Sequence, residues 1–168
     1  MDKKMLRDHR ARVLLYGLLM FLIMLLIFYM SSKSGKDSKH MSDTFSENFI
    51  GRFLIRFLPL LTENVRLSIR KYAHIFEFFC LGISSFLFFY ELFWLKTKRF
   101  VKTASTTAVW SFLYACSDEW HQTFVPERGG RISDLRFDAA GILAGIALVF
   151  YIVWKSRGIG RADTHKQI

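Results

Sequence analysis

The sequence predicts an all-α integral membrane protein, a bundle of four membrane-spanning helices with an interfacial amphipathic helix in the first outer loop. Just over half of the 168 residues, 52%, are hydrophobic, and the 18 phenylalanines exceed what a soluble core of this length requires. The apolar residues are gathered into long blocks, which is typical of chains that have the bilayer as their solvent. Basic residues mostly flank these blocks, as residues that set membrane topology do.

A single domain is predicted over residues 1–168, with spans at about residues 13–31, 71–95, 101–121 and 135–155. The first span carries no charge between Val13 and Met30, and that length is enough to cross a membrane. It is longer than the apolar region of a signal peptide and does not end in a small-residue cleavage site, so we expect an uncleaved helix. The polar segment Ser31–Ser42, rich in glycine, serine and lysine, predicts a solvated loop.

The interfacial helix is predicted at about residues 44–58. Phenylalanine recurs there at every fourth position, opposite a polar face; the repeating residues are Phe45, Phe49, Phe53 and Phe57. A helix with one apolar and one polar face is stable in the membrane interface. Packing of the same apolar face against the other helices of the protein is the alternative.

The second, third and fourth apolar blocks are too short to cross the membrane unaided. Their uncharged stretches cover residues 78–90, 103–117 and 139–154, whereas a crossing needs about 20 residues. Each helix therefore reaches full length only by drawing the charged residues at one end toward the membrane. Because successive spans alternate in direction, those three ends lie on the same side. Polar groups at membrane depth need partners, so one shared polar cluster is predicted there.

Basic residues set the predicted orientation. Five precede the first span, four lie in Lys96–Lys102, and four follow Trp154. The opposite side holds nearly as many basic residues, but they are spread over a long first loop or lie within the polar stretch. We therefore expect both termini in the cytoplasm and the polar cluster at the outer face of a cell membrane. The net charge of +10 does not predict nucleic-acid binding, because no basic face alternates with stacking aromatics in a soluble segment.

The predicted cluster contains groups suited to acid–base chemistry. Its candidate catalytic residues are His74, Glu77, Asp118, Glu119, His121 and Gln122. Histidine exchanges protons near neutral pH, and a carboxylate beside it can orient the ring. On the third span, Asp118 and Gln122 share a face with His121, whereas Glu119 points about a third of a turn away. An ion-pair network that only joins helix ends is the alternative.

A second set of residues in the cluster is suited to holding an anion. Arginine binds phosphate or carboxylate through two parallel hydrogen bonds, and glycine lets backbone N–H groups approach a ligand. The candidate ligand-binding residues are Arg70, Arg128, Gly129, Arg131, Asp134 and Asp138. The Gly129–Gly130 pair would serve a tight turn equally well. No cofactor and no metal site is predicted. The histidines and carboxylates of the cluster also allow metal binding, but this alternative is weaker because the chain has no closely spaced histidine pair such as HExxH.

Three segments of the chain together resemble the VanZ-like family of small bacterial membrane proteins. They are RKYAHIFEF at 70–78, DEWHQTFVPERGGRISD at 118–134, and the pattern D-x-x-G-x-x-x-G that starts at Asp138. The serine-rich SSKSG after the first span is similar as well. The family usually has glycine where this chain has Glu127. The resemblance implies that the signature positions are His74, Asp118, Glu119, His121, Gln122, Pro126, Arg128, Asp134 and Asp138.

The resemblance implies a role in the cell envelope, at the bacterial plasma membrane, because the family is named for a protein associated with resistance to the glycopeptide teicoplanin. It implies no reaction, so two functions stay open. The protein could bind an anionic lipid or lipid-linked wall precursor and so lower glycopeptide susceptibility. It could instead be an enzyme that modifies or hydrolyses a phospholipid or polyprenyl-linked substrate. Gly141 and Gly145 form a small-xxx-small pair, which predicts a close helix contact within the chain or in a homodimer.

Overall fold

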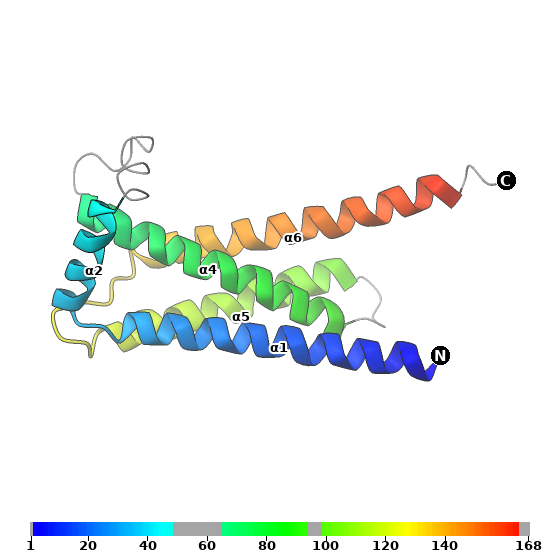
Figure 1. Ribbon diagram of the computed structural model, residues 1–168, viewed down its shortest axis with the longest axis horizontal. Coiled ribbons are helices and arrows are strands. Elements are labelled where there is room, and N and C mark those ends of the chain that lie inside the picture. The colour runs from blue at the N-terminus through cyan, green and yellow to red at the C-terminus, as the bar shows by residue number, and fades with distance from the viewer. Residues whose placement is uncertain (1, 49–64, 94–98, 165–168) are drawn as a thin grey trace.

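The computed structural model describes residues 2–48, 65–93 and 99–164, and these are helical almost throughout. The helices are α1 (Lys3–Ser31), α2 (Gly35–Glu47), α4 (Val65–Leu92), α5 (Arg99–Gln122) and α6 (Leu135–Thr164). The all-α class is therefore confirmed for the described residues, which contain no strand. Figure 1 shows α1, α4, α5 and α6 running lengthwise, with α2 across one end of the molecule. We call this end, where α1 and α5 finish and α4 and α6 begin, the α2 end.

Three helical segments are long and apolar enough to cross a membrane: Lys3–Ser31, Lys71–Leu92 and Leu135–Ser156. Their outward surfaces are apolar as well. On α1, for example, large side chains such as Leu14, which is 73% exposed, point away from the rest of the protein. A soluble protein rarely exposes a continuous apolar surface of this size, whereas lipid covers it at no cost. The chain is therefore a membrane protein.

Helix α4 is central to the packing, because it contacts α1, α5 and α6. It supplies the fully buried side chains Phe78, Leu81 and Phe86. These pack with residues of the surrounding helices in one apolar cluster, among them Ile27 of α1 and Ala115 of α5. The cluster fixes the rotation of each helix about its axis, and so decides which polar side chains face inward at the α2 end.

Glycines allow α4 and α6 to approach backbone to backbone. A Cβ atom on Gly141 would collide with the carbonyl oxygen of Ile75, and one on Gly145 would collide with that of Phe79. Small residues at such a spacing permit close helix contacts in membranes. Both glycines face α4 of the same chain, so the close helix contact described here is intramolecular.

The segment after α1 differs from the prediction, because residues 35–42 belong to helix α2 and are not a solvated loop. Ser34 explains the difference. Its Oγ accepts a hydrogen bond from the Asp37 backbone N–H at 3.2 Å and donates one to Asp37 Oδ2 at 2.8 Å. Ser34 is therefore the N-cap of α2, and the S-x-x-D pattern is a recognised sequence signature of a helix start. The predicted interfacial helix at 44–58 lies largely outside the described residues. Only 44–48 are described, and 44–47 belong to α2.

The turn between α1 and α2 is attached to the loop between α5 and α6. The Gly35 N–H donates to the carbonyl of Pro126 at 3.1 Å, and Lys36 Nζ lies 3.0 Å from Glu127 Oε1. The hydrogen bond to this carboxylate raises the pKa of the Lys36 ammonium. Glu127 has a φ of 58°, a left-handed conformation that costs a residue other than glycine about 1–2 kcal/mol. Glycine adopts this conformation without that cost, in line with the glycine that the resemblance implies at this position.

Candidate functional site

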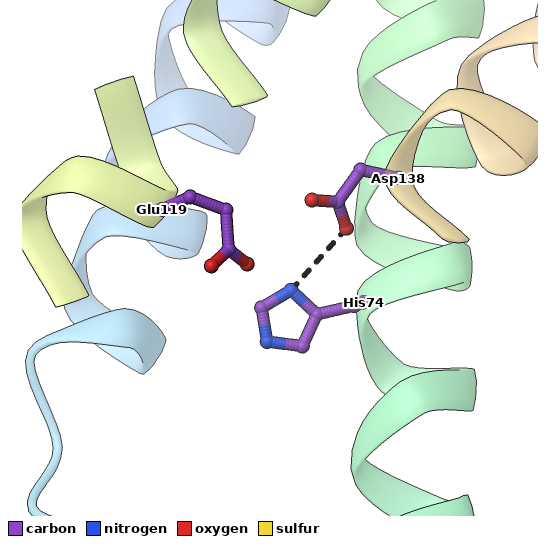
Figure 2. A group of neighbouring side chains, drawn as sticks. All are labelled: His74, Glu119 and Asp138. Carbon is purple, nitrogen blue, oxygen red and sulfur yellow. Dashed lines mark ion pairs between the residues drawn. The ribbon is translucent and has the colours of Figure 1, made fainter. Parts of the chain in front are cut away.

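Three charged side chains from three helices meet at the α2 end: His74 of α4, Glu119 of α5 and Asp138 of α6. One nitrogen or oxygen atom from each lies within 4.8 Å of the others. His74 Nδ1 is 3.4 Å from Asp138 Oδ1. Figure 2 shows the three side chains pointing toward one another from separate helices. We call these three residues the His74 group.

Close backbone packing positions the members of this group. Gly141 lies one turn after Asp138 and rests against Ile75, the residue after His74, so the missing side chain brings the Asp138 carboxylate within reach of the imidazole. Gly130 likewise allows the α5–α6 loop to pack closely on α5, because a Cβ atom there would collide with the carbonyl oxygen of Glu119. The next backbone N–H, that of Arg131, donates to Glu119 Oε2 at 2.7 Å. The α5–α6 loop thereby holds the Glu119 carboxylate in place.

The His74 group is buried and incompletely hydrogen-bonded. Asp138 is 0% exposed, Glu119 is 7% exposed, and the His74 side chain is 13% exposed. Within the described part of the chain, three buried atoms of this group have no hydrogen-bond partner: His74 Nδ1 and both carboxylate oxygens of Asp138. Burying a charged group without such partners is costly. One imidazole with two carboxylates can transfer protons or coordinate a divalent cation.

A second polar group joins the end of α1 to α5. Ser31 Oγ donates to Asp118 Oδ2 at 2.9 Å, and Gln122 Nε2 donates to the same oxygen at 2.8 Å. Arg128 reaches over this contact, with Nη1 donating to the Ser31 carbonyl at 3.0 Å and Nη2 to Ser38 Oγ at 3.2 Å. We call Ser31, Asp118 and Gln122 the Asp118 group. Arg128 thus holds the α1–α2 turn against α5.

Glu77 links the two groups electrostatically. It lies one turn after His74 on α4, and its carboxylate interacts with the charges of His74, Asp118 and Arg128. The interior of the α2 end therefore carries several carboxylates, those of Glu77, Asp118, Glu119 and Asp138, with few cationic groups to balance them.

The structure separates the two candidate histidines. His121 stacks on the ring of Phe28 with 4.6 Å between centroids, and its Nε2 lies 3.1 Å from Ser32 Oγ. His121, a residue of α5, therefore packs against the end of α1 and the turn that follows it. Its described contacts do not include the His74 group. Sequence reasoning did not select Ser31 and Ser32 as site residues. The feature of the sequence that could have indicated them is the SSKSG segment directly after the first span, in which the two serines are adjacent.

The other candidates for ligand binding lie at the edge of the site. Gly129 is exposed, and no atom within 4 Å would meet an added Cβ. The Arg131 side chain is exposed, although its backbone contacts Glu119. Asp134 is half-buried and precedes α6, where its carbonyl accepts hydrogen bonds from the first turn. Arg70 lies in α4, but its side chain is outside the described part of the structure.

Comparison with known proteins gives the family. No curated protein and no solved structure matches the chain. The sequence model of the VanZ/LLP1 family, however, matches residues 16–154. The matched region contains every member of the His74 and Asp118 groups and runs from the first apolar helix to the last. Because this match covers most of the 168 residues, the chain belongs to the VanZ/LLP1 family.

Proposed function

We propose that the protein crosses the bacterial cell membrane four times and binds the anionic head group of a lipid, or of a lipid-linked wall precursor, at its α2 end. Both termini then lie in the cytoplasm and the α2 end faces outward, which agrees with the basic residues before α1 and in Lys96–Lys102. By covering a wall precursor at this face, the protein would lower susceptibility to teicoplanin.

The fourth crossing in this proposal is α5, whose sequence is less apolar than that of the other long helices. Its hydroxyl side chains Thr103, Thr107 and Ser111 are fully buried, whereas large apolar residues such as Val109 and Leu113 are exposed. These three hydroxyls would thus be shielded from lipid, and the exposed Ser105 and Ser117 donate to backbone carbonyls of their own helix. At 24 residues, the helix is about 36 Å long, enough for a hydrocarbon core of about 30 Å.

The observation that carries the binding proposal is a set of basic residues that are close in sequence to the site residues at the α2 end. We call Lys33, Lys71, Arg131 and Arg136 the basic rim. Each lies within three residues of a site residue in the sequence, and the last three are exposed. Arg131 is the most direct case, because its backbone N–H is bonded to Glu119. Cations at a membrane surface attract anionic lipids by about 1 kcal/mol each, so the rim would draw a phosphate to the α2 end.

Replacing Lys33 and Arg131 together with glutamine is therefore expected to weaken head-group binding. Loss of two rim charges corresponds to roughly 2 kcal/mol, or about 30-fold in affinity. Affinities of purified protein in detergent for phosphatidylglycerol and for a polyprenyl diphosphate would be measured, with zwitterionic phosphatidylcholine as the lipid control. The matched control variant replaces Lys4 and Lys155, at the opposite end, with glutamine. An unchanged affinity, or an equal loss in both variants, would contradict the proposal.

A second candidate function is favoured by the His74 group, whose imidazole and carboxylates are the groups that acid–base hydrolysis of a phospholipid or polyprenyl-linked substrate needs. In this alternative, His74 transfers a proton and Asp138 orients its ring. The two functions differ in cells. An enzyme changes many more lipid molecules than there are copies of the protein in the cell. A binding protein affects at most about one lipid molecule per copy.

A further inference from the structure

The His74 group contains more negative charge than its neighbours balance. Asp138 is completely buried, and within the described residues its two oxygens have only the 3.4 Å contact with His74, with no hydrogen bond. Glu119 faces the same point, and Glu77 adds a third carboxylate nearby. Uncompensated charge at membrane depth is expensive and is normally paired or coordinated. A cation at the meeting point of the three side chains would supply what is missing.

We propose that His74, Glu119 and Asp138 bind a divalent first-row transition-metal ion, with Zn²⁺ as the preferred ion. Each residue offers one ligand atom, and these atoms lie within 4.8 Å of one another. Two ligand atoms on one zinc ion, at about 2.1 Å each, are at most about 4.2 Å apart. His74 and Asp138 already meet this limit at 3.4 Å, so a small side-chain rotation closes the group around an ion.

The kinds of ligand atom decide which ion is preferred. Imidazole nitrogen binds Zn²⁺ and similar ions well, whereas Mg²⁺ and Ca²⁺ prefer sites made of oxygen alone. Three protein ligands leave a coordination position open, as in catalytic zinc sites. The hydrogen bond from the Arg131 N–H to Glu119 Oε2 fixes this carboxylate from outside, as partners of metal ligands commonly do. No local sequence motif contains the three ligands, because they come from three different helices.

Metal content of the purified full-length protein tests this inference, and the test does not depend on lipid binding. The protein, with any affinity tag removed, is dialysed against Zn²⁺, Mn²⁺ or Mg²⁺ in detergent, and bound metal is counted by mass spectrometry. We expect one Zn²⁺ per chain. Glu119→Gln keeps an acceptor for the Arg131 N–H, and it should lower zinc affinity by at least about 10- to 100-fold, the loss found even when an outer partner of a ligand is removed.

His121→Gln is the matched control, since His121 lies outside the His74 group and should leave zinc affinity unchanged. His74→Gln should lower it as Glu119→Gln does. The inference is overturned if the wild type binds no zinc, if folded Glu119→Gln binds it as tightly as the wild type, or if Mg²⁺ displaces Zn²⁺. Should neither ligand variant fold, electron spin-echo spectra of the Mn²⁺-loaded wild type decide. Coupling to an imidazole nitrogen is expected, and its absence overturns the inference.

Discussion

Gly141→Ala is expected to destabilise the protein by about 1–3 kcal/mol, the cost of overfilling a closely packed contact. The added methyl group would meet the carbonyl oxygen of Ile75 and the backbone nitrogen of Phe79. Neither is a flexible side chain, so α4 and α6 must separate. Alanine in place of glycine inside a helix would by itself stabilise the helix by about 1 kcal/mol. The clash outweighs this gain, because it disturbs the contact that also brings Asp138 to His74.

Thermal unfolding in detergent and quantitative blotting of membrane fractions measure this effect. Gly129→Ala is the matched control, since nothing lies within 4 Å of a Cβ atom there, and it should unfold at the wild-type temperature. A Gly141→Ala protein as stable as the wild type, or more so, would mean that α6 does not contact α4 through this glycine.

Asp118→Ala is expected to reduce the amount of folded protein in the membrane severely. The change removes the common acceptor of Ser31 and Gln122, so each of these buried donors loses a hydrogen bond, at a cost of about 1–3 kcal/mol. Contacts between α1 and α5 would weaken first, because this group joins the end of α1 to the end of α5.

Blotting beside two comparison variants distinguishes this cause from general damage. Asp118→Asn keeps an acceptor oxygen and should be less depleted than Asp118→Ala. His121→Ala should accumulate normally, since a neutral imidazole stacked on Phe28 can be removed without leaving a charge unpaired. Normal levels of Asp118→Ala would show that the Asp118 group does not hold α1 to α5.

The sequence was sufficient to predict that polar helix ends gather on one side of the membrane. Three apolar blocks too short for a crossing, and the alternating direction of spans, lead to that conclusion without coordinates. The structure places His74, Glu119 and Asp138 from the three corresponding helices within 4.8 Å. These three residues are too far apart in the sequence to form a local motif. The group is defined only by the packing of the helices and the α5–α6 loop at Gly141 and Gly130.

Other features depended on rotation of helices about their axes, which the sequence leaves open. Helical spacing predicted that Glu119 points away from Asp118, but not that it points toward His74 while Asp118 faces α1. The two histidines were expected in one cluster, and the described contacts place them in different surroundings. Helix α2 was missed because its polar composition resembles a loop, although the Ser34–Asp37 cap was readable.

The central claim is that the buried carboxylates at the α2 end form a functional site and do more than join helix ends. Teicoplanin susceptibility of cells that express Glu119→Gln, at a membrane level equal to that of the wild type by blotting, tests it most directly. The same substitution at Glu127, whose carboxylate pairs with Lys36 in the loop, is the control and should protect as the wild type does. We predict that Glu119→Gln cells are as susceptible as cells without the protein. Full protection by Glu119→Gln at a normal level would contradict the claim and leave the cluster a structural ion network.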